Sequence, residues 1–109
     1  MDALTEQKCV ELAKAGDREA FDRLIADAWP RVPSVTMSVT NLNKTLAKDA
    51  AQQACVVAYL RIAQFEGRAR FHAWVSMIAR REARDLMVAA ARFEEDGVLA
   101  SSRRSVWWR

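Results

Sequence analysis

The sequence predicts an all-α domain, a compact bundle of about four helices, from its composition and from the spacing of its apolar residues. Only 3 glycines and 2 prolines occur in 109 residues, too few turn-forming residues for a β protein with many turns. Hydrophobic residues make up 51% of the chain, so one domain of this length can bury a core. We expect a helical domain over residues 1–92 and a flexible tail or linker over residues 93–109, which includes Trp107 and Trp108.

The first half of the chain carries the start and stop signals of helices. A helix over residues 4–15 is expected to end at Gly16 in a left-handed conformation, and Asp17 can cap the next helix. Pro30 interrupts or kinks that second helix, because proline has no amide donor. Residues 32–39 form an apolar segment that we expect to be helical again.

The third predicted helix covers residues 46–64, with Asn43 or Thr45 as its cap. A helix that is apolar on both sides is normally covered on both sides. Val57 and Leu60 face away from the expected core, so either the domain packs this second side internally or it meets a partner protein. The expected core stripe consists of Ala51, Cys55, Ala58, Tyr59 and Ile62.

The segment from Phe65 to Leu86 joins a short basic loop containing Gly67 to a helix that begins near Phe71. Cations can follow the phosphates of a nucleic acid strand, and a loop with aromatic neighbours can hold an unstacked base. The alternative is a solvated helix face with ordinary intrahelical ion pairs. The inward stripe consists of Phe71, Trp74, Val75, Ile78 and Leu86, and the arginines are Arg68, Arg70, Arg80, Arg81 and Arg84.

Charge is unevenly distributed along the chain. Residues 1–30 hold seven acidic and four basic side chains, whereas residues 61–92 hold seven arginines and three acidic side chains. An acidic end and a basic end indicate one polyanionic partner that binds on one side.

Several classes of function are disfavoured by the sequence. His72 is the only histidine, and no Cys/His/Asp cluster has the spacing of metal ligands, so we expect no metal and no cofactor. No glycine-rich phosphate loop or nucleophile elbow is present, which argues against an enzyme and against a small-molecule substrate. Cys9 and Cys55 are expected to be reduced thiols. Without an apolar signal region or a membrane-spanning run, the protein is expected to be cytoplasmic and free of the membrane.

Residues 4–92 resemble region 2 of the bacterial sigma factors of the extracytoplasmic-function group, within the sigma-70 family. Three motifs in the right order carry this resemblance. They are AKAGDREAFDRLI at residues 13–25, AKDAAQQA at residues 47–54 and FEGRARFHAWVSMIARREARDL at residues 65–86.

The resemblance implies two roles. The third helix would dock on the clamp helices of the β′ subunit of core RNA polymerase, through Asp49, Gln52 and Gln53. The loop and the helix after it would capture the non-template strand of the minus-ten promoter element and hold a flipped base. The implied DNA-binding residues are Phe65, Arg68, Arg70, His72, Arg80, Arg81 and Arg84. An anti-sigma factor is a further possible partner.

The chain departs from the family pattern in ways that bear on function. Lys48 and Gln53 stand where carboxylates are common, which weakens attraction to an arginine-rich clamp surface. Arg81 stands where the family commonly has asparagine; arginine grips phosphate or guanine but lacks the amide's mixed donor and acceptor. The domain that reads the minus-thirty-five element is not in this chain, which is therefore expected to be an excised domain or a natural short relative. The alternative function is a sigma-like interaction module, an anti-sigma decoy or a dimer, that does not initiate transcription.

Overall fold

The protein is described by a computed structural model that covers residues 1–99, with side chains described as far as residue 94. No strand occurs in this range, and the prediction of an all-α fold is confirmed. The α-helices are α1 (Ala3–Lys14), α2 (Arg18–Ala28), α3 (Val32–Val39), α4 (Lys44–Arg61) and α5 (Phe71–Leu99). Two short 3-10 turns, η1 (Trp29–Arg31) and η2 (Ile62–Gln64), complete the set.

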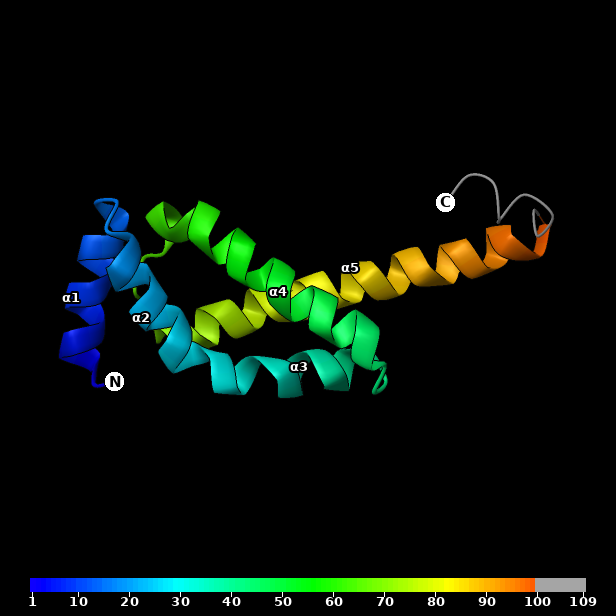
Figure 1. The fold of residues 1–109 in the computed structure, drawn as a ribbon, viewed down its shortest axis with the longest axis horizontal. Helices are drawn as coiled ribbons and strands as arrows, with labels where there is room; N and C mark the ends of the chain where they lie inside the picture. Colours follow the sequence, from blue (N-terminus) through cyan, green and yellow to red (C-terminus); the bar gives the residue numbers. More distant parts are fainter. Residues whose placement is uncertain (100–109) are drawn as a thin grey trace.

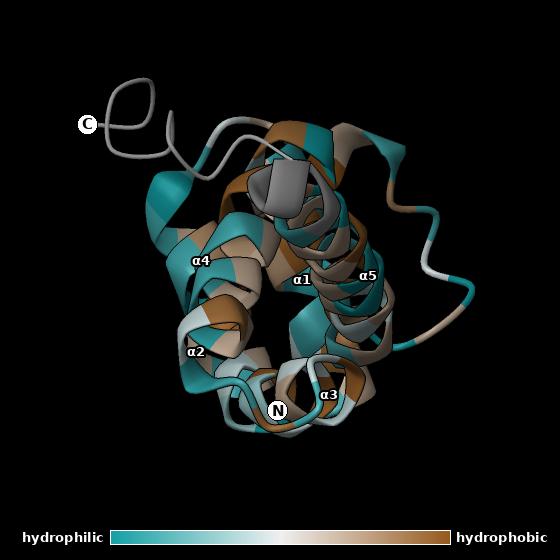
Figure 2. Cartoon of the chain, turned by 90° about the vertical axis from the view of Figure 1, so that its right-hand side faces the viewer, coloured by the Kyte–Doolittle hydropathy of each residue, from teal (hydrophilic) through white to brown (hydrophobic). Residues whose placement is uncertain are grey.

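The helices are arranged around α5, the longest of them (Figure 1). Helix α2, the turn η1 and α3 follow one another along one side of the bundle, and α4 runs back beside them. Helices α3 and α4 both pack against α5, while α1 packs mainly on α2 at the end where α5 begins. The end-on view of Figure 2 shows these helices grouped around a shared interior. The far part of α5 extends past the other helices.

Local signals in the sequence set the helix ends. Gly16 has a φ of 101°, the left-handed conformation expected of it, and the Asp17 carboxylate accepts a hydrogen bond from the Ala20 amide at 3.1 Å. Helix α4 begins two residues earlier than predicted, because Asn43 is its cap and accepts from the Leu46 amide at 3.1 Å. Asp2 caps α1, and the hydrogen bond from the Thr5 amide lowers the pKa of the Asp2 carboxyl.

The predicted helix over residues 32–39 is confirmed as α3, although it is rich in β-branched residues. Two buried threonines, Thr36 in α3 and Thr40 as its C-terminal cap, pair their hydroxyl groups with carbonyls of the helix. The Thr36 hydroxyl donates to the Pro33 carbonyl at 3.1 Å, and the Thr40 hydroxyl donates to the Thr36 carbonyl at 2.8 Å. Because neither hydroxyl is left unpaired, α3 can turn this face into the core without a large desolvation cost.

The core face of α4 consists of small residues, which corrects the predicted stripe. Cys55 is only half-buried and Tyr59 is 43% exposed, so these two members lie at the edge of the stripe, while Ala51, Ala58 and Ile62 are buried as predicted. Alanine lets the α4 backbone approach α5 closely, and the facing side of α5 also carries small residues, Ala79 and Ala83. The fully or nearly fully buried residues are Ala47, Ala50, Ala51, Ala54 and Ala58 on α4, and Phe71, Val75, Ala79 and Ala83 on α5.

Helix α5 runs beyond residue 92, the last residue of the expected domain. The sequence shows no continuing periodicity after Phe93, and we expected a flexible tail from that residue. The helix instead continues through Phe93 to Leu99. The rest of the expected tail, with Trp107 and Trp108, lies outside the described residues.

The alanine seam between α4 and α5 yields a stability prediction. Ala54→Leu adds three heavy atoms at a fully buried position and should lower the free energy of unfolding by about 1–3 kcal/mol through overpacking. Gln53→Leu, at the neighbouring exposed position, should change it by less than about 0.5 kcal/mol. Urea denaturation followed by circular dichroism measures both. Equal effects of the two substitutions would show that the seam is not tightly packed.

Candidate functional site

The loop between η2 and α5, residues 65–70, is built over a buried aromatic cluster. Phe65 is only 4% exposed; its ring centroid lies 5.7 Å from that of Phe71 and 5.0 Å from that of Trp74. Gly67 adopts a φ of 76°, which glycine tolerates best, and lets the chain turn at the loop tip. The ring of Phe65 is enclosed by Phe71 and Trp74 and supports the loop from below, and the contact with DNA expected of Phe65 stays a prediction.

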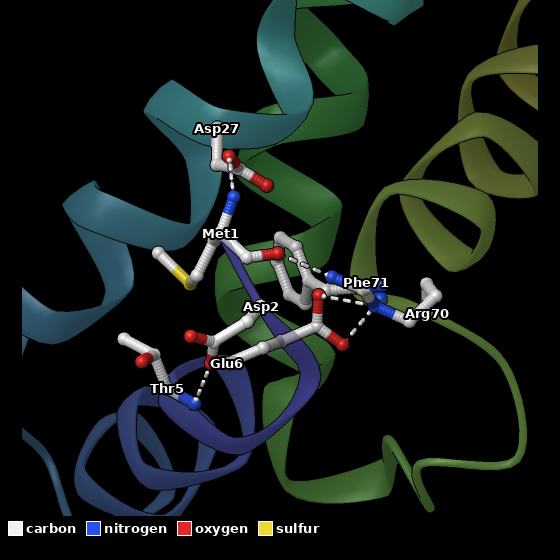
Figure 3. Close-up of polar contacts among 7 residues, drawn as sticks. All are labelled: Met1, Asp2, Thr5, Glu6, Asp27, Arg70 and Phe71. Atoms are coloured by element: carbon white, nitrogen blue, oxygen red, sulfur yellow. Dashed lines mark hydrogen bonds and ion pairs between the residues drawn. The ribbon is translucent and has the colours of Figure 1, made fainter.

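The carboxylate of Glu6 fastens this loop to α1 (Figure 3). Its Oε1 accepts from Nε of Arg70 at 3.1 Å, and its Oε2 accepts from the backbone amide of Phe71 at 3.1 Å. Glu6 is 6% exposed, so these two bonds satisfy a nearly buried charge. The Phe71 amide is the first of α5, and Glu6 thus supplies a negative charge to the positive end of that helix from the far end of the sequence.

Arg70 makes internal hydrogen bonds, although 44% of its side chain stays exposed. Its Nη2 also donates to the Met1 carbonyl at 2.6 Å, and the Met1 amino group lies 3.0 Å from the Asp27 carboxylate (Figure 3). One chain of polar contacts therefore links α2, α1 and the start of α5. The guanidinium therefore anchors the loop, and the expected contact of Arg70 with phosphate stays a prediction.

A hollow lies on each side of the loop. The side toward α1 has a hollow of about 680 Å³, whose wall includes Glu6, Lys14 and Arg68. The side toward α5 has a hollow of about 350 Å³, lined by the loop together with Gln64, Trp74 and Met77. The second hollow offers an aromatic ring, a side-chain amide and backbone groups, which are the groups that recognise an unstacked base.

The exposed face of α5 leads away from this second hollow. Met77, Arg81, Arg84 and Val88 recur at i, i+4, i+7 and i+11, so they form one exposed stripe on the helix. Arg80 is also exposed and flanks the stripe. Within residues 1–94, none of these three arginines forms an ion pair. The stripe can therefore offer its charge to a polyanion that leaves the hollow.

Two other predicted DNA-binding residues are placed differently. Arg68 is strongly exposed at the loop and pairs with Glu66 at 3.0 Å, a surface contact that a phosphate can replace at little cost. His72 is half-buried and lies nine positions before Arg81, which puts it on the opposite side of α5 at 100° per residue. Arg68 and Met77, the first residue of the exposed stripe, both line the second hollow, whereas His72 lies on the side of α5 opposite Arg81.

The outer face of α4 carries the residues expected to meet the polymerase. Asp49, Gln52 and Gln53 are all exposed, as predicted. Asp49, Gln53, Val56 and Leu60 recur at i, i+4, i+7 and i+11 and so share one face of α4. Val56 and Leu60 are 50% and 72% exposed. Val57 is half-buried at the edge of this face. The apolar pair exposed on α4 is therefore Val56 and Leu60, rather than the expected Val57 and Leu60, and it extends the polar face instead of forming a separate one.

Sequence reasoning missed Glu6, although a signal was present. Glu6, Cys9, Val10 and Ala13 recur at i, i+3, i+4 and i+7 and are all buried. A lone acidic residue on an apolar helix stripe needs a buried partner, and that partner here is 64 residues away in the sequence. The separation in sequence hides the pairing. The position of the carboxylate on an apolar stripe nevertheless indicates that Glu6 is buried and needs a partner.

Over residues 1–99, no helix combines the length and the apolar character needed to cross a bilayer. In the same part of the chain, His, Cys, Asp and Glu side chains do not gather in groups of three or more that could hold a metal ion.

The amino-acid sequence matches a known protein family. Residues 19–93 match the family described as Sigma-70 region 2, which covers more than half of the chain. The protein therefore belongs to the sigma-70 region 2 family. No solved structure gives a significant match.

Individual relatives give the same assignment. The chain is 30% identical over 91 residues to the RNA polymerase sigma-H factor of Pseudomonas aeruginosa, which covers 84% of this chain and 47% of that protein. It is 29% identical to the ECF RNA polymerase sigma-E factor of Haemophilus influenzae and 30% identical to that of Escherichia coli K12, each over 89 residues, covering 82% of this chain and 46% of the relative. The chain thus spans about half the length of these relatives.

The Glu6 contacts predict a specific loss of stability. Glu6→Gln keeps the shape but removes the charge, and it turns an amide NH₂ toward one of two donors, Arg70 or the Phe71 amide. The free energy of unfolding should fall by about 1–3 kcal/mol. Glu11→Gln, an exposed change on the same helix, is the control and should have little effect. Urea denaturation measures both, and indistinguishable curves would mean that the Glu6 contacts contribute nothing.

Proposed function

We propose that this chain is the promoter-opening module of an alternative sigma factor, which binds core RNA polymerase and the non-template strand of the minus-ten element. The observation that carries the proposal is the continuity between the hollow beside Trp74 and the arginine stripe of α5. Membership of the sigma-70 region 2 family and the printed names of the relatives, all sigma factors of RNA polymerase, support the same role.

The DNA role follows from what single-stranded DNA offers. A strand that leaves the duplex presents a flat base, which a stacking surface can bind, and a phosphate backbone, which cations can bind. The stacking surface and the cations must therefore lie next to each other along the path of the strand. The hollow supplies Trp74 and Gln64. Arg81 and Arg84 follow Met77, which also lines the hollow, at one and two turns of α5. Capture of an extruded base offsets part of the cost of unstacking it, so this surface favours the opened promoter over the closed duplex.

The polymerase role is assigned to the outer face of α4. Helix α4 packs against α5 through its alanine face, so its Asp49, Gln52 and Gln53 side points away from the arginine stripe. Two partners of different chemistry can therefore be bound without sharing a surface. The clamp helices of the β′ subunit would meet the polar end of this face, and Val56 with Leu60 would add apolar contact at the other end.

A second candidate function rests on the same exposed pair. Val56 and Leu60 lie side by side on α4, one turn apart, and a contact between two protein surfaces would shield them from water. The chain would then be a sigma-like interaction module, such as a decoy for an anti-sigma factor or a dimer, with no part in initiation. Such a module would not need the arginine stripe, so the DNA experiment separates the two candidates.

The DNA role predicts a charge-specific loss of binding. Arg81→Ala and Arg84→Ala should each weaken binding of a non-template-strand oligonucleotide and lower the slope of log affinity against log salt by about one unit. Arg70→Ala should change the slope less, because Arg70 is held by Glu6. Arg23→Ala, at an exposed position on α2, is the control. Fluorescence anisotropy over a salt series gives both quantities; slopes that match wild type for Arg81→Ala and Arg84→Ala would refute the DNA role.

The polymerase role predicts a separate loss. Asp49→Arg reverses the single carboxylate on the predicted docking face and should reduce co-purification with core RNA polymerase by tenfold or more, by about 1.4 kcal/mol. Its melting temperature should stay unchanged, because Asp49 is exposed and has no ion-pair partner within residues 1–94. Glu19→Arg, an exposed reversal on α2, is the matched control. Equal recovery of polymerase with both variants would remove the docking role from α4.

A further inference from the structure

Met77 is a long apolar side chain exposed on an otherwise charged surface. It lines the hollow beside the loop together with Trp74, which lies one turn earlier on α5, and 68% of it is exposed. The next members of its stripe along the helix are Arg81 and Arg84. Met77 therefore adds little to the core, and its thioether lies between the aromatic ring of the hollow and the arginines.

The four methionines of the chain differ in their access to solvent. Met1 is 37% exposed, and Met37 and Met87 are half-buried. Oxidation of a thioether requires that the oxidant reach the sulfur, so an exposed methionine is oxidised before a covered one. Met77 is thus the methionine that a dissolved peroxide reaches most easily.

Oxidation at this position changes the surface that a base would meet. The Trp74 ring is held by Phe65 and Phe71, at centroid distances of 5.0 and 5.7 Å. Met77 beside it offers a flexible, polarizable thioether, which makes favourable contacts with aromatic rings. A sulfoxide is polar, and its oxygen carries partial negative charge. It therefore disfavours both apolar contact with a base and the approach of a phosphate.

We propose that Met77 is an oxidation site through which peroxide weakens the capture of single-stranded DNA, an inference that rests on the DNA role proposed above. Hydrogen peroxide transfers one oxygen atom to the thioether. The sulfur lone pair forms the S–O bond, the O–O bond breaks, and the proton of the transferred oxygen passes to the leaving hydroxide to give water. The sulfur loses two electrons and the peroxide gains them. A methionine sulfoxide reductase reverses the change.

The two thiols of the chain are poorer targets for peroxide at neutral pH. Cys9 is almost fully buried, and burial raises the pKa of the half-buried Cys55 thiol. Little thiolate is then present, and the thiolate is the form that peroxide attacks. A thiol reductant restores a cysteine oxidised to a sulfenic acid or a disulfide and leaves methionine sulfoxide in place, so the two kinds of damage can be separated.

The test treats the protein with hydrogen peroxide at neutral pH and then with a thiol reductant, and follows each methionine by peptide mass spectrometry. Met77 should be oxidised first, and a bound non-template-strand oligonucleotide should slow its oxidation. Fluorescence anisotropy should show at least threefold weaker binding of the oligonucleotide after oxidation. The salt slope should be unchanged, because the sulfoxide carries no net charge. Methionine sulfoxide reductases of both stereospecificities should restore the affinity.

Two substitutions of Met77 serve as matched controls. Met77→Leu keeps an apolar side chain without sulfur, so it should bind the oligonucleotide like untreated wild type both before and after peroxide. Met77→Gln places a polar, uncharged amide at the same position and should bind as weakly as the oxidised wild type. Both variants should fold, because the position is exposed.

The proposal is overturned if another methionine is oxidised before Met77, if oxidised wild type keeps its affinity, or if Met77→Leu is as sensitive to peroxide as wild type. Arg81→Ala distinguishes such a result from a failure of the DNA role. If Arg81→Ala binds weakly with a smaller salt slope while oxidation has no effect, the DNA role stands and this inference is wrong. If Arg81→Ala matches wild type in affinity and slope, the DNA role is wrong and the inference fails with it.

Discussion

The buried carboxylate of Glu6 is the contact on which the functional loop depends. It joins α1 to Arg70 and to the first amide of α5, while Arg70 holds the Met1 carbonyl in turn. A loop with a glycine at its tip has few contacts of its own, and its position must come from its two ends. The aromatic cluster under Phe65 holds one end and Glu6 holds the other. The shape of the hollow beside Trp74 is thus fixed by a residue at the opposite end of the sequence.

The second constraint is the use of small residues between α4 and α5. Alanines at 0% exposure on both helices bring the two backbones together, and they leave the larger and charged side chains to the outer faces. Those outer faces point in different directions, one with Asp49 and Leu60, the other with Arg81 and Arg84. Close packing of this kind separates surfaces of opposite character within a domain that is only a few helices thick. The proposed functions for DNA and polymerase both rely on that separation.

The sequence predicted best what depends on near neighbours. The caps at Asp17 and Asn43, the turn at Gly16 and the exposure of Asp49 are decided within one helical turn, and all were correct. The expected core stripe of α4 was right at Ala51, Ala58 and Ile62 and wrong at Tyr59, because a close helix pair buries alanine and leaves a large ring at its edge. The contacts of Phe65 and Arg70 could not be predicted for another reason. Their surroundings come from distant segments, and basic or aromatic character alone does not show whether a side chain is free.

In the proposed function, one face of this bundle holds a DNA strand while another holds the polymerase. Ultraviolet cross-linking of a non-template-strand oligonucleotide to the domain, measured while core RNA polymerase is added, tests whether both can be bound at once. The yield of domain cross-linked to DNA should be kept or should increase as polymerase saturates the domain, because the two faces do not overlap. A yield that falls in step with added polymerase would show that the two partners compete for one surface, and would rule out two separate faces.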